Sequence, residues 1–356
     1  MKSRVAFAGV AVFAVTIASS MDRPEGAGQI VARRLETNPL ITLRSSASLG
    51  DNINGPSIIR VPEWVERPLG RYYMYFAHHS GHHIRLAYAD AIGGPWRIHE
   101  PGVLPVGKTA FTRPLPDPLR GPGSFYTHVA SPEVYVDHAN RRFIMWTHGM
   151  WTNGERWPDD VKAAQDWARE KRYGQLTQVS ESRDGLVFEA RPALTRVSYL
   201  RVFRQGDWFY GMARSGRLAR ARDPLATFEA GGNPFAGGAH AASIRHVALL
   251  VRGQTLYVFF TAIGDAPERV LVSTVDLTRD WTEWRATPAV EVLRPERSYE
   301  CADLPLVPSR AGELSKRANE IRDPAILDEG GSTYLFYSLC GEQGIAAAEL
   351  TLSDTR

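Results

Sequence analysis

Three acidic residues near the end of the chain have surroundings that suit acid–base chemistry. Glu300 and Asp303 lie in the proline-punctuated segment 299–309, next to an aromatic residue, and Asp323 follows in an Arg-Asp-Pro sequence. If these side chains meet at one site, a protonated carboxyl would face an ionised carboxylate, the arrangement that cleavage of a glycosyl bond requires. The alternative is a solvated loop with a disulfide at Cys301.

Histidines form a second concentration of chemically versatile groups. Segment 78–83, His-His-Ser-Gly-His-His, contains four of the ten histidines, and His128 and His246 stand elsewhere in the chain. Neutral imidazole is the commonest metal ligand in proteins, and it also binds sugar hydroxyls or a carboxylate. The spacing fits no closed zinc site, and a polar loop is the third interpretation. We expect His82, His83, His128 and His246 to contact the substrate.

The elements that must position these residues repeat along the chain. One aromatic-rich strand pattern occurs five times, and each copy follows an earlier apolar strand across a turn that contains Gly or Asn. Its five copies are 72–77, 142–147, 208–213, 256–261 and 334–338. Regular repetition of one hairpin is typical of propeller blades and is not expected of a β-sandwich. The sequence predicts an all-β, five-bladed β-propeller in a single domain, 50–356.

Propeller geometry indicates where the chemistry lies. The first strand of each blade lines the axis, and its opening residue points into the central funnel. Alignment of the five units places these residues at the opening positions: Gly55, Ser131, Tyr199, His246 and Asp323. Close to them in sequence are Asn54, His128, Glu133, Arg201 and Arg322. Buried charges need partners, so packing alone does not favour such a ring, although any one member could form a structural ion pair.

One helix interrupts the strands. Segment 159–173 is predicted to be a short helical insertion in the second blade, with Asp159 or Asp160 as its N-cap and Gly174 at its end. Its expected apolar face consists of Val161, Ala164, Trp167 and Ala168. The simpler interpretation is a packed surface helix. The other is a rim above the funnel that presents Trp151 or Trp157 to a ligand.

The composition excludes several classes of protein. The 356 residues are 44% hydrophobic and 23% charged, which is ordinary for a globular chain. The formal net charge is +3 and the basic residues do not cluster, so no nucleic-acid partner is expected. The two cysteines, Cys301 and Cys340, could pair, although their separation is not readable from the sequence. The oligomeric state is not indicated.

The chain begins with the pattern of a secretion signal. Lys2 and Arg4 precede an apolar run, and Ala18-Ser-Ser follows with the small residues that a signal peptidase selects. The apolar run is shorter than a comfortable membrane span. We therefore expect residues 1–20 to be a signal peptide, 21–49 an N-terminal segment, and the protein to be periplasmic or secreted with no stable membrane span after cleavage. An uncleaved anchor is the alternative.

Several segments of the repeated blades resemble those of the five-bladed β-propeller glycoside hydrolases, in particular the family-43-like glycosidases. The resemblance rests on Asn54-Gly-Pro-Ser-Ile-Ile, Ala130-Ser-Pro-Glu-Val-Tyr-Val-Asp, and Arg322-Asp-Pro-Ala-Ile-Leu with their following strands. It covers about residues 50 to 352 and involves mostly scaffold positions.

The resemblance implies three axial carboxylates: an Asp base, an Asp that tunes the acid, and a Glu acid. This sequence departs from that pattern, because the first-blade Asp is Gly55 and the second-blade Asp is Ser131, whereas the fifth blade keeps Asp323. Replacements for the base are Asp51, Glu133 and Asp323, and those for the acid are Glu300 and Asp303. The resemblance also implies a divalent cation such as calcium on the axis, which His246 would contact through water.

Three functions are compatible with these residues. The favoured one is an exported glycosidase that acts on a glycan or oligosaccharide in the funnel, with rim aromatics such as Trp151, Trp157 and Tyr126 stacked on sugar faces. The second is a non-catalytic carbohydrate-binding propeller. The third is a polysaccharide lyase that uses Tyr199 with His246 or His128, while Arg201 or Arg322 holds a uronate. A carboxylate pair would support the first, and a Tyr–His pair facing an Arg the third.

Overall fold

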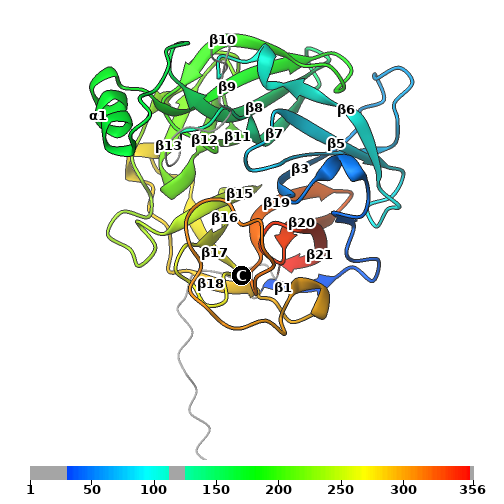
Figure 1. Cartoon of the computed structure of the whole chain (residues 1–356). Helices are drawn as coiled ribbons and strands as arrows, with labels where there is room; N and C mark the ends of the chain where they lie inside the picture. Colours follow the sequence, from blue (N-terminus) through cyan, green and yellow to red (C-terminus); the bar gives the residue numbers. More distant parts are fainter. Residues whose placement is uncertain (1–29, 112–124, 353–356) are drawn as a thin grey trace, which may run out of the picture.

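The computed structural model describes residues 30–111 and 125–352, in which five antiparallel sheets surround a common centre (Figure 1). Four sheets follow the chain in order, strand by strand, and the fifth includes strands from both ends of the described chain. The prediction of a five-bladed propeller is confirmed. The signal peptide expected at residues 1–20 lies outside the described residues.

The strands of each blade are given from the axis outward. Blade 1 comprises β3 (Asn54–Arg60), β4 (Tyr72–Ala77), β5 (His83–Ala89) and β6 (Arg97–Pro105). Blade 2 comprises β7 (Ala130–Asp137), β8 (Arg142–Trp151), β9 (Gly174–Ser182) and β10 (Glu189–Thr195). Blade 3 comprises β11 (Arg201–Gln205), β12 (Trp208–Met212), β13 (Leu218–Ala221) and β14 (Glu229–Ala230). Blade 4 comprises β15 (Ile244–Arg252), β16 (Thr255–Ala262), β17 (Val270–Asp276) and β18 (Val290–Leu293).

Blade 5 closes the ring by joining distant parts of the sequence. Its inner strands are β19 (Arg322–Glu329), β20 (Ser332–Leu339) and β21 (Gly344–Leu352), and its outer strand is β1 (Ile30–Arg34). The short strand β2 (Ile41–Thr42) also pairs with β21. The division at residue 50 expected from the sequence is therefore not a structural boundary, because β1 and β2 complete the last sheet and leave β21 without a free edge.

The inner strands bend where they open toward the axis. The pairing shifts register at the start of four of them: between Asn54 and Ser57, Ala130 and Glu133, Ile244 and Val247, and Arg322 and Ala325. Gly55, Ser131 and Asp323 lie within these bulges at φ 61°, 47° and 50°, and Tyr199 precedes β11 at φ 59°. Non-glycine residues seldom adopt positive φ. Four of the five opening residues aligned from the sequence therefore share a positive φ, whereas the fifth, His246, lies in the bulge of β15 without one.

The axis is tightly packed at this level. A Cβ atom on Gly55 would lie 3.2 Å from Ser131 Cα, so blades 1 and 2 approach each other with almost no space for a side chain. The left-handed conformation of Gly55 also favours glycine there. A family-type Asp at this position would need both a strained backbone and a wider axis.

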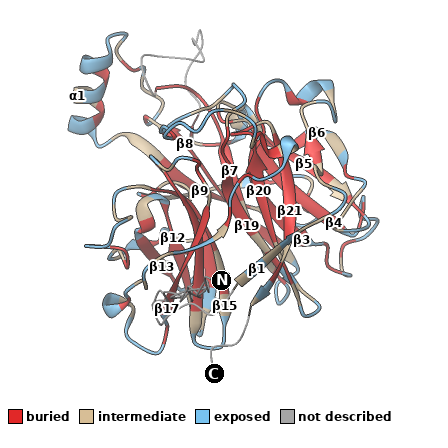
Figure 2. Cartoon of the chain, turned by 90° about the horizontal axis from the view of Figure 1, so that it is seen from below, coloured by how far each residue is buried: buried red, intermediate tan, exposed pale blue. Residues whose placement is uncertain are grey.

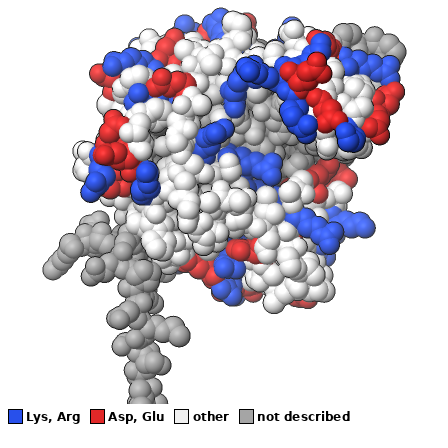
Figure 3. Space-filling view, turned by 90° about the vertical axis from the view of Figure 1, so that its left-hand side faces the viewer, with Lys and Arg blue, Asp and Glu red and all other residues white. Residues whose placement is uncertain are grey.

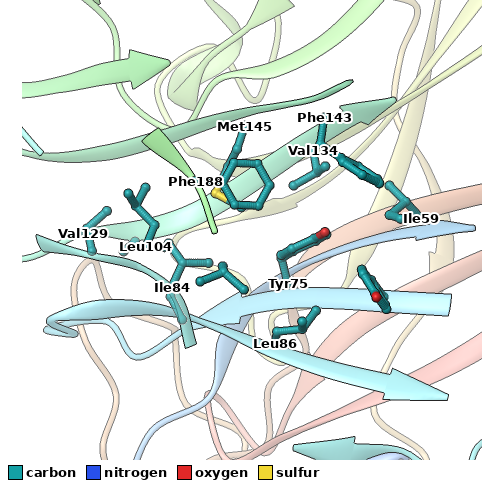
Figure 4. Close-up of a cluster of buried hydrophobic side chains, with 14 of the residues drawn as sticks. Ile59, Tyr75, Ile84, Leu86, Leu104, Val129, Val134, Phe143, Met145 and Phe188 are labelled. Carbon is teal, nitrogen blue, oxygen red and sulfur yellow. The ribbon is translucent and has the colours of Figure 1, made fainter. Parts of the chain in front are cut away.

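The core lies between neighbouring blades. Figure 4 shows one such layer, in which side chains from blades 1 and 2 interdigitate, including Tyr75, Ile84, Val134, Phe143 and Met145. The strand interiors are buried and the exposed residues concentrate in the connections (Figure 2). The alternating aromatic and aliphatic residues of the repeated strands therefore supply both faces of each sheet.

The predicted helix is present in blade 2. The α-helix α1 (Val161–Lys171) connects β8 to β9 and projects at the periphery (Figure 1). Asp160 is the N-cap, accepting a hydrogen bond from the Ala163 amide at 2.9 Å. The helix ends at Arg172 in the left-handed conformation, before the Gly174 that the sequence suggested.

The expected apolar face of α1 is partly right. Ala164 and Ala168 are buried, whereas Val161 is 44% exposed. Trp157 is only 2% exposed and packs with Phe125 in the same cluster. The simpler interpretation of a packed surface helix is the correct one, and Trp157 is not a rim aromatic because its ring fills this cluster.

Cys301 and Cys340 form a disulfide. It ties the end of the 3-10 helix η5 (Ser298–Glu300) to the turn after β20, and both cysteines lie in the core between blades 4 and 5. Chain segment 301–321, which includes residues at the mouth of the axis, is thereby anchored at its start. No helix among the described residues is both long and apolar enough to span a membrane.

Candidate active site on the propeller axis

A cavity of about 370 Å³ opens on the axis, beside the bends of the inner strands. Every blade, or the connection leading into it, contributes to its wall. The lining residues are His79, Tyr126, Gln175, Tyr199, Arg214, Arg245, His246, Ala311, Gly312 and Glu313. Of the residues predicted from the sequence to act on or contact substrate, Tyr126, Tyr199 and His246 line this cavity.

His246 is held in one orientation by blade 5. Its Nδ1 donates a hydrogen bond to Asp323 Oδ1, and Ser338 Oγ donates to Asp323 Oδ2 at 3.1 Å. The proton is therefore placed on Nδ1, and Nε2 has no partner among the described hydrogen bonds. Burial, followed by the positive charge of Arg245, lowers the pKa of His246 well below its usual value. The arrangement favours a neutral imidazole with an available lone pair.

Tyr199 lies directly beside this imidazole. The two ring centres are 4.3 Å apart, and the phenol has no described hydrogen-bond partner although it lines the cavity. Burial raises the pKa of Tyr199 above its usual range, so the phenol stays protonated at neutral pH. Its positive φ is a strained conformation for a bulky residue, of the kind that concentrates at functional sites.

Further rings continue the stack on the other side of Tyr199. His148 stacks on Tyr199 at 3.7 Å between ring centres, His128 follows at 5.5 Å from His148, and Tyr126 lies 4.2 Å from His128. Burial lowers the pKa of His128 to about 3 and that of His148 well below its usual value. These imidazoles are neutral and support Tyr199 as a rigid wall. His128 was predicted to contact substrate, but it is fully buried.

Two guanidinium groups reach the cavity wall. Arg245 is buried and binds Glu268 through Nε and Nη2, at 2.7 and 2.9 Å. Arg214 is exposed and forms no ion pair within the described parts of the chain. Neither residue was predicted from the sequence. Arg245 directly precedes the opening residue of blade 4 and could have been found by the same alignment, whereas no repeat marks Arg214.

Carboxylates are scarce in the cavity wall. Among the described residues Glu313 alone supplies one, and it accepts a hydrogen bond from Ser80 Oγ at 2.8 Å. Asp323 is fully buried behind His246. The wall therefore offers no pair of facing carboxylates.

Arg322 is part of a buried charge network outside the wall of the axial cavity. It is 1% exposed and pairs with Glu320 and with Glu342, the latter at 3.0 Å. Glu342 also accepts a hydrogen bond from Asn52 and lies 3.4 Å from His79 Nδ1. Arg322 does not line the axial cavity, because its guanidinium is enclosed by these carboxylates, and the substrate contact predicted for it has no support at this site.

Arg201 and Glu133 fill the axis away from the cavity wall. Arg201 donates to the carbonyl oxygens of Pro56, Pro132 and Val247, and to Glu133 Oε2 at 2.9 Å. One side chain thus joins the inner strands of blades 1, 2, 3 and 4. Neither residue lines the cavity, so the structure does not bring them to the site as expected.

The acids proposed from the sequence are also elsewhere. Glu300 is fully buried and accepts hydrogen bonds from Arg34 at 2.8 Å and from the Tyr337 hydroxyl at 2.6 Å, which locks η5 against blade 5. Asp303 is exposed and does not line the cavity. Asp51 is exposed and pairs with His78 at 3.0 Å. Neither Glu300 nor Asp303 has a described contact with Asp323, since Glu300 is bound by Arg34 and Tyr337 and Asp303 is exposed.

The remaining predicted contacts lie around the site without facing it. Asn54 is buried, with Nδ2 3.4 Å from His79 Nδ1, and its Oδ1 has no hydrogen-bond partner among the described residues. His82 is exposed, and His83 begins β5 outside the cavity wall. Trp151 packs edge-on against Tyr173 at the end of β8. Of the histidine segment, only His79, which we had not singled out, reaches the cavity.

A directly bound cation has no evident ligand set. The parts of the chain that the structure describes contain no group of three or more His, Cys, Asp or Glu side chains placed to hold a metal ion. In addition, His246 turns Nδ1 toward Asp323. These residues do not fit a directly ligated metal, and the water-mediated contact to His246 stays a prediction.

Comparison with known proteins finds a relative in sequence and several solved structures of similar fold. An uncharacterized protein of Acanthamoeba polyphaga mimivirus is 33% identical over 347 residues, covering 91% of each chain. The chain belongs to the family of this viral protein. No established family model matches the sequence.

The solved structures that resemble the chain are glycosidases. The GH43 protein BlXynB of Bacillus licheniformis has a TM-score of 0.56 at 13% identity over 92% of this chain, which spans 55% of that protein. An α-L-arabinofuranosidase of Lactobacillus brevis scores 0.55 at 11% identity, covering 89% of this chain and 93% of its own. A GH43 β-xylosidase/α-arabinofuranosidase from a compost microbial metagenome scores 0.53 at 13% identity, with 92% and 96% covered. The resemblance to the GH43 propeller fold is confirmed; at this identity it concerns the fold alone.

Proposed function

We propose that this chain is an enzyme that breaks a glycosyl bond in the axial cavity. The observation that carries the proposal is the alignment Asp323–His246–Tyr199, with its last two members on the cavity wall. The likeness in fold to solved glycosidases supports a carbohydrate substrate.

His246 and Tyr199 have complementary protonation states. His246 Nε2 is the base, because Asp323 fixes the proton on Nδ1 and stabilises the imidazolium that forms. Tyr199 is the acid, because its raised pKa keeps the phenol protonated until the leaving oxygen develops charge. Adjacent groups with separated pKa values are the usual mark of an acid–base pair.

Catalysis by two carboxylates has less support. A glycosidase of that kind needs two carboxyl groups flanking the bond, about 5–9.5 Å apart. Of the described carboxylates, Glu313 reaches the cavity wall, while Asp323 is covered by His246. The acid–base roles that the sequence suggested for Glu300 and Glu133 are therefore replaced by Tyr199 and His246.

The test is a panel of polysaccharides and oligosaccharides, with new reducing ends as the readout. Tyr199→Phe and His246→Gln should each lower kcat by about 10²–10⁴-fold, the range of general acid–base catalysis, without changing the melting temperature appreciably. Matched controls are Tyr135→Phe and His99→Gln, which alter the same residue types outside the cavity wall.

Either of two results would refute the proposal. Full activity in both site variants would remove Tyr199 and His246 from the chemistry. Glycan binding by the wild type without cleavage of any panel member would favour a non-catalytic carbohydrate-binding propeller.

We also propose export, supported by the signal-like residues 1–20; N-terminal sequencing of the protein from culture medium or periplasm tests it.

A further inference from the structure

The two cations of the cavity differ in how far they are neutralised. Arg245 shares its charge with Glu268 and also donates to the Arg310 carbonyl oxygen at 2.6 Å through Nη2, but its Nη1 makes no described hydrogen bond. Arg214 has no acidic partner within 30–111 and 125–352. Glu313 is the single described carboxylate of the wall, and it is held by Ser80. Glu268 and Glu313 match the two guanidinium groups in number, so what the cavity offers an anion is Arg214, which has no described acidic partner, together with Arg245 Nη1.

This charge lies at the acid–base pair and not at a remote rim. Tyr199, His246, Arg214 and Arg245 line the same cavity, and Arg245 is the chain neighbour of His246. After burial, which dominates at both sites, the positive charges of Arg214 and Arg245 lower the pKa of His246 and oppose the rise in the pKa of Tyr199. An anionic group bound between the two arginines would sit next to the reacting atoms.

The face of the molecule shown in Figure 3 offers no comparable reason to bind an anion. On the face shown in Figure 3, basic and acidic side chains are interspersed and separated by broad uncharged areas. A long polyanion held by surface charge would need a continuous basic track. The recognition is therefore local, directed at one acidic group within the cavity.

Resting on the proposed function, we propose that the substrate is a glycan containing a uronic acid, and that the chain cleaves it by β-elimination. Arg214, assisted by Arg245 Nη1, binds the uronate carboxylate and withdraws charge from it. A guanidinium suits this role because it binds carboxylates through two parallel hydrogen bonds. Withdrawal of charge makes the proton on the adjacent ring carbon, C5, more acidic.

The elimination is balanced by groups already present. His246 Nε2 removes the C5 proton, the C5–H electron pair becomes the C4–C5 double bond, and the C4–O bond breaks. The departing oxygen takes the phenol proton of Tyr199. The proton on His246 then returns to the Tyr199 phenolate, whose ring centre is 4.3 Å away, and restores both groups. The products are one new chain end and one unsaturated uronate; neither water nor a redox partner is consumed.

The experiment compares acidic and neutral glycans with two readouts. Polygalacturonate, polyglucuronate, polymannuronate and polyguluronate are tested beside their methyl esters and a neutral panel of xylan, arabinan and galactan. New reducing ends report any cleavage, and the ultraviolet absorbance of the unsaturated uronate reports elimination alone. We expect absorbance and reducing ends to appear together on at least one polyuronate.

The arginine variants test recognition of the acid. Arg214→Gln should raise KM for the responsive polyuronate about 10- to 100-fold, the loss expected for a charge-assisted hydrogen bond. Arg214→Lys should restore part of the affinity. Arg214→Gln should change KM for the methyl ester little, because the ester carries no charge. Arg217→Gln is the matched control: it is exposed, three residues away, and does not line the cavity.

The outcomes separate this inference from the proposed function. Reducing ends from neutral glycans without absorbance would overturn elimination while keeping glycosyl-bond cleavage. An unchanged KM in Arg214→Gln would overturn the acid contact even if absorbance appears. No cleavage of any glycan would overturn both proposals.

Discussion

Arg201 provides the sharpest test of how the axis is built. The sequence suggested a substrate contact, whereas the structure shows a side chain that joins four blades. Its bonds to the Pro132 carbonyl and Glu133 are 2.6 and 2.9 Å, and those to Val247 and Pro56 are 3.2 and 3.3 Å. Only the two shorter bonds are expected to contribute fully, at about 1.5–3 kcal/mol each for a charged donor.

Arg201→Met should therefore lower the free energy of unfolding by about 3–6 kcal/mol, the sum of these two bonds. This sum agrees with the usual cost of removing one partner of a buried ion pair, because Glu133 is left without its guanidinium. Met replaces most of the lost volume, so a cavity adds little. The double variant Glu133→Gln/Arg201→Met should recover part of the loss, since no charge then remains unpaired.

The pH dependence of the variant follows from Glu133. Burial already raises the pKa of Glu133 despite the opposing charge of Arg201. Without Arg201 the folded-state pKa rises further above the unfolded value, so the folded state holds a proton that the unfolded state releases. Stability of Arg201→Met should then fall as pH increases through the range between these two pKa values, relative to wild type.

Urea unfolding followed by tryptophan fluorescence measures each difference, with exposed Arg217→Met as the control. At a temperature where Arg201→Met is folded, its KM should equal that of wild type because Arg201 does not line the cavity. A loss below about 1 kcal/mol, the range of exposed ion pairs, would refute the reasoning. A selective rise in KM without a loss of stability would indicate that Arg201 contacts the substrate.

Three further predictions concern the scaffold. Glu300→Gln should lower the free energy of unfolding by about 3–5 kcal/mol, because Arg34 loses a fully buried carboxylate partner. The kcat of the folded variant should equal that of wild type, and a selective loss of kcat would contradict this. Cys301→Ala/Cys340→Ala removes a disulfide with a sequence separation of 39 and should lower the free energy of unfolding by up to about 4 kcal/mol. The comparison is with wild type, with and without reductant. Equal stability would show that packing alone holds the loop. Although burial opposes it, the charge of His79, with Arg322 and Asn52, lowers the pKa of Glu342 to about 2. The contribution of Glu342 to stability is therefore present above its unfolded-state pKa and is lost as pH falls toward 2. Glu342→Gln should make the free energy of unfolding less dependent on pH in this acidic range, and an unchanged dependence would argue against the network.

The repeated hairpins made the fold predictable from sequence. Each blade carries its own aromatic-rich strand, and alternation at period two determines which side chains enter the core whatever the neighbouring blade contains. The opening residues of the inner strands could be aligned for the same reason, and the left-handed backbone at Ser131, Tyr199 and Asp323 agrees with that alignment. Helix α1 was equally local, because its cap and its alanine face lie within one segment.

The site was only partly predictable, because side-chain partners depend on which blades meet. Tyr199 and His246 were identified as ring members, but their contact joins blades 3 and 4, and the Asp323 that orients His246 comes from blade 5. Arg201 and Arg322 carry the same charge as Arg214, yet two are enclosed by carbonyls or carboxylates and one is exposed in the cavity wall.

Local patterning thus determined the blades, the helix and the positions of the axial ring, because short-range periodicity decides which residues face inward. Only the closed tertiary structure decided which charges are paired and which are available. A carboxylate such as Glu300 can be recognised in a sequence, but its role depends on whether Arg34, far away along the chain, folds against it. The same closure, made by β1 on β21, brings the two ends of the described chain into one blade and completes the ring around the cavity.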